Sequence, residues 1–407
     1  MVYICPYGVR LGNIGSQDLG LFRDGVYLRC VVCGSSYKVD PWLMRCVACG
    51  GLLEVVMPRV SGFEWSRVRV RRFGVWRYRE LLPLADSIEP ITMGEGGTPL
   101  VRVNRVVAGS VFVKLEGCNP TGSFKDRGMT VGVTIAKALG VEGVVVASTG
   151  NTAASAAAYA SRAGLRCLVV LPRGGVARGK LAQALLHGAE VMEVNGYFDD
   201  ALELVVDKFI ARRSGNLYPL NSINPWRLEG QKTLAFELVD ELGEPPDVVI
   251  VPVGNAGNIA AIWKGFKELK ELGVISRTPR MIGVQAEGSA PLFRTWTSGS
   301  KELLVVKEPR TIASAIRIGR PVNWVKALKA VEESRGALVT VSDSEILDSM
   351  KKLARLEGLE VEPASAATLA GYRRALEEGL IDKSEVAVLV ATGHALKDPD
   401  SINLILA

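Results

Sequence analysis

Short apolar runs alternate along the chain with longer segments in which apolar residues recur at helical spacing. Four runs have the length of a buried strand: residues 111–115, 144–147, 248–253 and 386–390. Three helix-period segments follow the first three runs: residues 129–139, 152–163 and 259–272. Strands that alternate with helices in this way predict an α/β fold with open, mostly parallel sheets.

Polar, glycine-rich turns follow these strands and are the candidate functional segments. They occupy residues 116–128, 148–151, 254–258 and 391–399. In open α/β sheets, ligands bind outside the carboxyl ends of the strands, where helix N-termini present unpaired N–H groups. We therefore expect a site that is assembled from distant parts of the chain.

Two of these turns suggest particular chemistry. The glycines of residues 254–258 would let backbone N–H groups close on an oxyanion, which predicts a phosphate cup, although ordinary tight turns also use glycine. Lys125 lies where an extended turn enters a helix. The positive helix end disfavours an ammonium there and favours the neutral amine that attacks a carbonyl. A solvated surface lysine is the alternative.

Four of the seven cysteines fall in one short window. They form two CxxC pairs: Cys30, Cys33, Cys46 and Cys49. Each pair aims two thiolates at one point, so the two pairs predict a tetrahedral structural zinc site in an N-terminal ribbon. Two disulfides or two redox dithiols are the alternatives, and a reducing cytoplasm disfavours both.

Composition limits the remaining classes of protein. The chain has 407 residues, of which 48% are hydrophobic and 23% charged, as in an ordinary globular protein of two or three domains. Two histidines are too few for a multi-histidine metal site. The net charge of +6 comes partly from an arginine-rich stretch at residues 67–79, for which a solvated face is favoured over a nucleic-acid interface.

The sequence shows neither a membrane-spanning segment nor a signal peptide, which bears on where in the cell we expect the protein. No apolar run reaches the roughly 18 residues that span a bilayer, which predicts no membrane segment. The N-terminal residues have neither the basic region nor the apolar core of a signal peptide. We therefore expect a cytoplasmic protein.

Seven motifs together resemble the pyridoxal-phosphate enzymes of fold type II and, within them, the threonine synthase family. They lie at residues 94–99, 120–128, 148–155, 221–233, 254–258, 311–319 and 392–399. The second reads Pro-Thr-Gly-Ser-Phe-Lys-Asp-Arg-Gly, and the last reads Thr-Gly-His-Ala-Leu-Lys-Asp-Pro. The cysteine ribbon is similar to an extension on archaeal-type members.

The resemblance implies a pyridoxal 5'-phosphate site. Lys125 would carry the cofactor as an imine, and Asn151 would bond its phenolate oxygen. Its phosphate would be bound by Gly254, Asn255, Ala256, Gly257 and Asn258. Thr392 would meet the pyridine nitrogen. A hydroxyl can donate to a neutral nitrogen but cannot hold it protonated as a carboxylate would, so electron withdrawal would come mainly from the imine.

The resemblance also implies a phosphorylated amino acid as substrate. Its phosphate and carboxylate would be gripped by Ser148, Thr149, Thr152, Asn221, Ser222 and Arg227. The implied reaction converts O-phospho-L-homoserine and water to L-threonine and phosphate, with Lys125 shuttling the protons. Arg320 and Ala395 depart from the family pattern, where asparagine and glycine are expected.

Two other functions remain open. A related enzyme could perform β-replacement on O-phosphoserine, as a cysteate synthase or an O-phosphoserine sulfhydrylase does. More distantly, a zinc-ribbon protein could bind nucleic acid through residues 67–79, but that leaves the polar turns unexplained.

The expected architecture is two-lobed with an added ribbon. A zinc-ribbon-like segment occupies residues 1–60, and a larger α/β domain combines residues 61–130 with 226–407. A smaller α/β domain at residues 131–225 lies between those two parts in sequence. The resemblance implies a homodimer that has a small-molecule substrate and no nucleic-acid or membrane partner.

Overall fold

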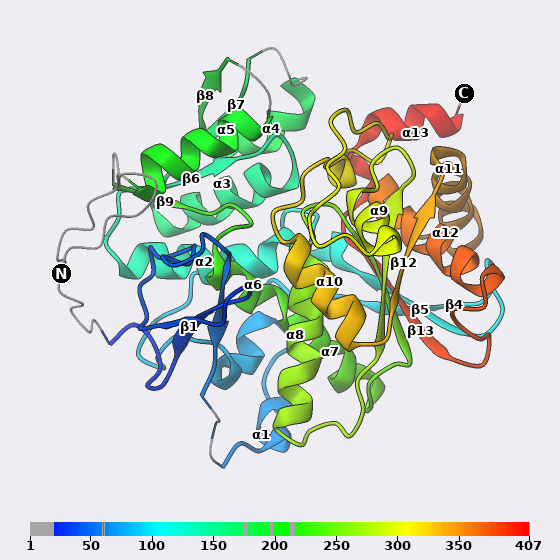
Figure 1. The fold of residues 1–407 in the computed structure, drawn as a ribbon, viewed down its shortest axis with the longest axis horizontal. Coiled ribbons are helices and arrows are strands. Elements are labelled where there is room, and N and C mark those ends of the chain that lie inside the picture. Colours follow the sequence, from blue (N-terminus) through cyan, green and yellow to red (C-terminus); the bar gives the residue numbers. More distant parts are fainter. Residues whose placement is uncertain are drawn as a thin grey trace. The chain divides into compact units, whose positions relative to one another are not determined.

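The computed structural model describes residues 20–58, 60, 62–173, 178–195, 198–211 and 216–406. These residues form two compact units (Figure 1). The first unit comprises Met1–Ser61, Arg79–Met93 and Arg127–Gly230, and the second comprises Gly62–Tyr78, Gly94–Asp126 and Gln231–Ala407. Of the ribbon segment expected at residues 1–60, the first 19 residues and residue 59 lie outside the described residues.

A small antiparallel sheet begins the first unit. Its strands are β1 (Tyr27–Cys30), β2 (Ser36–Tyr37) and β3 (Leu53–Val56), in the order β2-β1-β3. The two CxxC pairs lie in turns at its end, where the Gly34 N–H donates to the Cys30 carbonyl and the Gly50 N–H donates to the Cys46 carbonyl. Both glycines have positive φ, at 76° and 72°, a conformation that a side chain would disfavour.

A parallel sheet forms the rest of the first unit. Its order is β8-β7-β6-β9, from β6 (Gly143–Ala147), β7 (Arg166–Pro172), β8 (Glu190–Val194) and β9 (Leu217–Pro219). The associated helices are α3 (Asn151–Ala163), α4 (Arg178–Leu186), α5 (Phe198–Leu204), a π-helical turn Val205–Ala211 and α6 (Pro225–Gln231). Every residue of β6 is buried, as its unbroken apolar sequence predicts.

The second unit is built on a larger sheet. Its order is β12-β11-β10-β13-β5-β4, from β4 (Leu100–Val103), β5 (Ser110–Leu115), β10 (Val248–Pro252), β11 (Arg280–Ala286), β12 (Ala337–Val341) and β13 (Val386–Ala391). Only β4 runs antiparallel to its neighbour among these strands. The prediction of open, mostly parallel sheets is therefore confirmed.

Helices α8, α9, α10 and α12 pack on this larger sheet. The helices of the second unit are α1 (Trp65–Arg69), α7 (Thr233–Leu242), α8 (Gly257–Glu271), α9 (Pro291–Ser298), α10 (Trp324–Glu333), α11 (Asp343–Lys352), α12 (Pro363–Glu377) and α13 (Pro399–Leu406). Helix α12 packs across β10 to β13 and buries a small-residue face against them. Helix α8 packs on β10 and β11 and also contacts α7 and α10.

Helix α2 (Lys125–Ala138) runs across the division between the units, because Lys125 and Asp126 belong to the second unit and the rest belongs to the first. None of the described helices is long and apolar enough to cross a membrane.

The arginine-rich stretch is partly buried, unlike the solvated face that we expected. Arg77 is 5% exposed, and its Nε lies 2.8 Å from the Asp240 carboxylate, itself 4% exposed. Asp240 also accepts from Arg69 and from the Tyr78 hydroxyl. The charge pattern alone could not show this, because the acidic partner lies far along the chain on α7. Arg69 and Arg77 thus hold this stretch against helix α7 of the second unit.

The buried pair predicts a difference between two arginines of this stretch. Arg77→Met leaves Asp240 with fewer compensating charges in a dry site, so we expect a loss of about 3 kcal/mol. Arg67→Met breaks a pair with Glu64 in which both side chains are more than half exposed, and we expect less than about 0.5 kcal/mol. Urea unfolding of both variants measures this, and equal midpoints would contradict it.

Candidate active site

The order of the larger sheet brings three predicted turns to one edge. Strand β13 pairs in parallel with β5 on one side and with β10 on the other. Because parallel strands end at the same edge of a sheet, the turns after these three strands are neighbours. The second unit alone thus gathers the segments that carry Lys125, Thr392 and residues 254–258.

The turn before Lys125 is bonded directly to the turn that contains Thr392. The Phe124 N–H donates to the Thr392 carbonyl at 2.9 Å, and the His394 N–H donates to the Gly122 carbonyl at 3.0 Å. Lys125 is the first residue of α2, and its Nζ lies 4.3 Å from the centroid of the Phe124 ring. The lysine is therefore held in the first turn of a helix and beside Thr392.

Asp126 fixes this turn from the other side. Its carboxylate accepts from the Thr121 backbone N–H at 2.7 Å and from the Thr121 hydroxyl at 2.6 Å. The Lys397 ammonium donates to the Thr121 carbonyl at 2.9 Å. Burial lowers the pKa of Lys397, although the nearby Glu362 and Asp126 charges oppose that shift.

The turn at residues 254–258 has the shape of a cradle. A Cβ on Gly254 would meet the Ala315 carbonyl oxygen at 2.9 Å, so only glycine fits there. Ala256 has a φ of 64° and precedes the first turn of α8, whose N–H groups have no partner within the helix. The buried Asn258 side-chain nitrogen has no hydrogen-bond partner among the described residues. A donor left unpaired beside a helix N-terminus fits a bound phosphate.

Thr392 has two polar neighbours that the sequence reasoning missed. Its hydroxyl donates to the Glu362 carboxylate at 3.2 Å, and the Ser365 hydroxyl lies 3.2 Å from it. All three side chains are at most 4% exposed. A Glu-Pro pair before a small-residue helix is the signal that could have directed attention to Glu362, but it also fits an ordinary helix start.

The first unit contains a second group of predicted residues. Ser148, Thr149 and Asn151 follow β6, where the Ser148 hydroxyl accepts from the Gly150 N–H at 3.3 Å and α3 begins. The Asn221 side chain, after the neighbouring strand β9, bonds both the N–H and the carbonyl of Ala147 at 3.0 and 2.9 Å. Asn221 thereby fixes the turn after β6.

Arg227 is the most unusual member of this group. It is 1% exposed, and one terminal nitrogen donates to the Leu220 carbonyl at 2.8 Å. Its Nε and its other terminal nitrogen have no hydrogen-bond partner among the described residues. Burial lowers the pKa of Arg227 to about 10, which leaves it a cation at neutral pH. A buried guanidinium with unused donors fits an anion.

The remaining predicted residues of this group, Thr152 and Ser222, are half-buried. Both are in the first unit, on α3 and after β9. The predicted residues thus fall into two groups. Lys125, Thr392 and residues 254–258 belong to the second unit, and Asn151 and the predicted substrate residues belong to the first.

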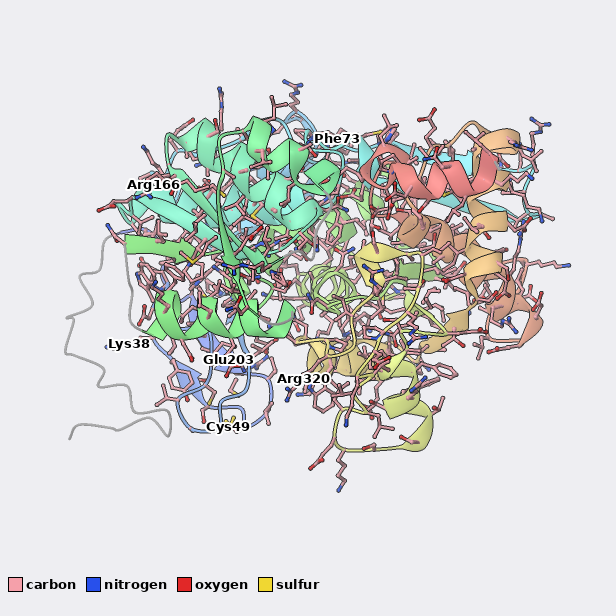
Figure 2. All side chains as sticks on the ribbon, turned by 90° about the horizontal axis from the view of Figure 1, so that it is seen from above. Lys38, Cys49, Phe73, Arg166, Glu203 and Arg320 are labelled. Atoms are coloured by element: carbon pink, nitrogen blue, oxygen red, sulfur yellow. The ribbon has the colours of Figure 1, made fainter. Side chains whose placement is uncertain are left out.

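The four cysteines converge as predicted. Their sulfur atoms all lie within 4.8 Å of one another, with Cys30 and Cys49 3.5 Å apart and Cys33 and Cys46 3.5 Å apart. A disulfide would need about 2.05 Å, whereas an ion bound at 2.3 Å to four sulfurs would hold them about 3.8 Å apart. The arrangement therefore fits a tetrahedral metal site. Figure 2 shows Cys49 on the blue N-terminal segment.

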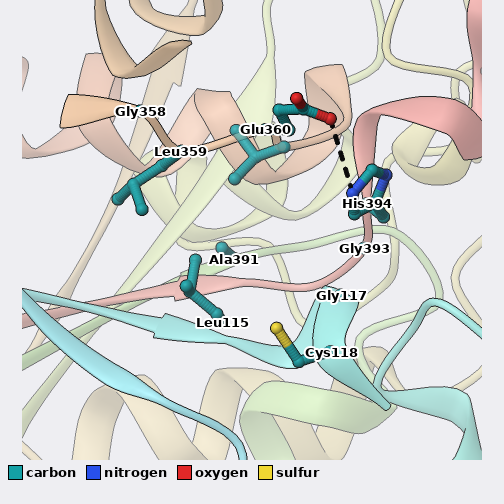
Figure 3. A pocket seen from close by; sticks show the side chains of 10 residues that line it. Leu115, Gly117, Cys118, Gly358, Leu359, Glu360, Ala391, Gly393 and His394 are labelled. Atoms are coloured by element: carbon teal, nitrogen blue, oxygen red, sulfur yellow. Dashed lines mark ion pairs between the residues drawn. The ribbon is translucent and has the colours of Figure 1, made fainter. Parts of the chain in front are cut away.

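A pocket of about 280 Å³ lies at the carboxyl ends of β5 and β13 (Figure 3). Its walls are mostly apolar, and Cys118, His394 and Glu360 are its polar members. His394 and Glu360 approach to 3.6 Å. Burial and the Glu116 charge raise the pKa of Cys118, so its thiol is not an activated nucleophile.

The chain matches a known family over most of its length. The family described as "Pyridoxal-phosphate dependent enzyme" matches residues 91–393. The chain therefore belongs to this family of pyridoxal-phosphate dependent enzymes, as its motifs indicated.

Similar proteins with the name threonine synthase extend over nearly the whole chain. The threonine synthase of Methanocaldococcus jannaschii is 53% identical over 384 residues, which are 92% of this chain and 93% of that protein. The threonine synthase of Methanosarcina acetivorans is 49% identical over 382 residues, again 92% and 93%. The crystal structure of threonine synthase from Escherichia coli has a TM-score of 0.73 at 21% identity and covers 93% of this chain and 91% of that one, which shows a shared fold.

Proposed function

We propose that this protein is a threonine synthase, which converts O-phospho-L-homoserine and water to L-threonine and phosphate. The observation that best supports a phosphorylated substrate is the buried Arg227 guanidinium, whose Nε and one terminal nitrogen find no partner in the part of the chain that the structure describes. The names of relatives at about half identity over most of the chain support the same reaction.

The second unit would hold the cofactor. Bound pyridoxal phosphate would supply an electron sink that makes the protons on the substrate's α and β carbons removable. The cradle of residues 254–258 would bind its phosphate through backbone N–H groups and the Asn258 side-chain nitrogen, for which the described residues offer no partner. Lys125 would hold it covalently, and once released its amine would move protons between the substrate carbons. Thr392 would face the ring nitrogen.

The first unit would bind the substrate's anions and the cofactor's phenolate. Arg227 would pair with the substrate phosphate, since a bidentate guanidinium matches that geometry. Ser148, Thr149, Thr152 and Ser222 would add hydroxyl donors around the N-terminus of α3 (Figure 1). Asn221 would contribute by holding the turn after β6 in place, and Asn151 would bond the phenolate oxygen of the cofactor.

The cysteine cluster would hold one structural zinc ion. Four thiolates close a tetrahedral site and leave no position for substrate, so the ion would stabilise the ribbon and take no part in the reaction. We further propose that the protein is a cytoplasmic homodimer, which the resemblance to its enzyme class implies.

Substrate choice tests the proposed function. We expect the purified holoprotein to release phosphate and threonine from O-phospho-L-homoserine, and Lys125→Ala to lose both this turnover and the borohydride-reducible cofactor link. O-phosphoserine is shorter by one methylene, so we expect it to be turned over poorly. Faster consumption of O-phosphoserine with sulfide or sulfite would instead favour β-replacement and would draw attention to the exposed Arg320 (Figure 2).

Arg227→Ala should separate substrate binding from cofactor binding. Losing a charge-assisted contact in a buried site lowers kcat/KM by roughly 30-fold to 1000-fold. Cofactor content should stay near wild type, because the cradle lies in the other unit. The matched control Arg166→Ala removes an exposed arginine of the same unit that pairs with Glu190, and it should leave kcat/KM unchanged. A parallel loss of cofactor in Arg227→Ala would contradict this assignment.

Cys33→Ser should lower the zinc content from about one ion per chain and lower the thermal midpoint of the first unit. Trp42 of the ribbon packs edge-on against Tyr218 of β9, with ring centroids 5.1 Å apart. Because β9 leads to Asn221, we expect KM to rise while the cofactor is retained. Cys118→Ser is the matched control outside the cluster. Elemental analysis that finds no metal in freshly reduced wild type would overturn the zinc assignment.

A further inference from the structure

Gly132 is a buried glycine in the middle of helix α2, where glycine is less favourable than alanine. The structure shows what its missing side chain makes room for. A Cβ at this position would meet the Leu220 Cδ2 at 2.6 Å and the Arg227 Cγ at 3.1 Å. The first distance is too short for two carbon atoms, and the second is tight. The space beside Gly132 is therefore filled by Leu220 and by the aliphatic part of Arg227.

Helix α6, which carries Arg227, lies directly against α2 (Figure 1). A Cβ on Gly230 of α6 would overlap the Arg127 carbonyl oxygen and would meet the Gly128 Cα at 3.1 Å, so the two backbones touch there. Gly132 follows Gly128 by four residues, and Gly230 follows Arg227 by three. Residues at these spacings share one face of a helix. Arg227 therefore leaves α6 on the face that meets α2.

The guanidinium of Arg227 is held at one end by Leu220. One terminal nitrogen donates to the Leu220 carbonyl at 2.8 Å. Its Nε and its other terminal nitrogen find no partner among the described residues, although the residue is only 1% exposed. These two nitrogens share one edge of the planar group, the edge that binds an oxyanion through two hydrogen bonds. The position of this edge thus depends on the two groups that face Gly132.

We propose that Gly132 is a positioning residue for the substrate anion, because the absence of a side chain there fixes where the open edge of the Arg227 guanidinium lies. This inference rests on the proposed function, which assigns Arg227 to the substrate phosphate. Gly132 would touch neither substrate nor cofactor. A methyl group at this position would displace Leu220 and the aliphatic part of Arg227, which are the groups nearest to it. All of these residues belong to the first unit.

The test is the binding of inorganic phosphate to the full-length holoprotein, in which the cofactor fills the cradle of residues 254–258. We expect Gly132→Ala to raise the Kd of phosphate, measured by calorimetric titration, at least about tenfold, as the loss of one charge-assisted hydrogen bond does. For O-phospho-L-homoserine, kcat/KM should fall roughly 10-fold to 100-fold, the effect of a misplaced binding group. Cofactor content should stay near wild type, because the cradle lies in the other unit.

A second pair of variants shows whether the effect passes through Arg227. Arg227→Ala should itself weaken phosphate binding. In that background, the further change Gly132→Ala should alter the Kd of phosphate little, because the group that Gly132 positions is already gone. A purely structural role of Gly132 would instead give effects that add.

Gly371 provides a matched control. It is a buried glycine inside α12 of the second unit, and a Cβ there would overlap the side chain of Val284. Gly371→Ala therefore also places a methyl group against the end of a core side chain, but in the unit that does not contain Arg227. It should leave the Kd of phosphate unchanged, whatever it does to the urea midpoint.

Leu220→Val extends the test to the case in which Gly132→Ala fails to fold. The shorter side chain removes the Cδ2 that a methyl group at position 132 would meet first, whereas the Arg227 Cγ would still lie 3.1 Å from that methyl group. Gly132→Ala combined with Leu220→Val should therefore bind phosphate several-fold more weakly than Leu220→Val alone.

Several outcomes would overturn the proposal. They are a wild-type protein that shows no Arg227-dependent phosphate binding, a folded Gly132→Ala with the wild-type Kd, additive effects of Gly132→Ala and Arg227→Ala, and an equal loss in Gly371→Ala. Equal Kd values for Leu220→Val with and without Gly132→Ala also do so. Threonine formation by the wild type is scored separately. Its absence beside phosphate binding that depends on both Arg227 and Gly132 would remove the proposed function and leave the role of Gly132 intact.

Discussion

The pairing of β13 with β5 on one side and with β10 on the other brings the candidate cofactor residues together. The three strands are parallel, so their carboxyl ends meet at one edge, and each strand is followed by a polar turn. Hydrogen bonds from Phe124 to Thr392 and from His394 to Gly122 then join two of these turns directly. Lys125 and Thr392 are thus neighbours because of backbone pairing, before any side-chain contact is considered.

Two buried arginines of the molecule differ in whether their charge is paired. Arg77 and Asp240 are both buried and pair with each other, so their charges serve the fold. Arg227 is equally buried, but only one of its nitrogens has a hydrogen-bond partner within the described part of the chain, the Leu220 carbonyl, and its Nε and other terminal nitrogen have none there. Leaving donors unpaired in a protein interior is unfavourable unless a ligand completes them. The contrast between these arginines separates a structural ion pair from a candidate binding group.

The sequence predicted the fold class because periodicity is a local property. The apolar run at residues 144–147 and the small-residue segment after it correspond to β6 and α3 within about a residue. The cysteine cluster was also predictable, since CxxC spacing restricts where two thiols can point. What could not be predicted were pairings between distant segments, such as Arg77 with Asp240 and Thr392 with Glu362. These pairings depend on the order of the strands and on the packing of the helices. A local sequence pattern contains no information about either.

The cysteine ribbon contacts the segment that carries Arg227, although none of the predicted cofactor or substrate residues lies in the ribbon. The length of its described part is close to about 40 residues. Chains shorter than this usually need a metal or disulfides to fold. The ribbon packs on the rest of the first unit through aromatic contacts: Trp42 on Tyr218, and Phe22 on Trp226 with ring centroids 4.4 Å apart. Trp226 immediately precedes Arg227, so these contacts lie on the segment that carries the buried guanidinium. A metal bound by four cysteines would therefore help to fix that segment while taking no part in chemistry.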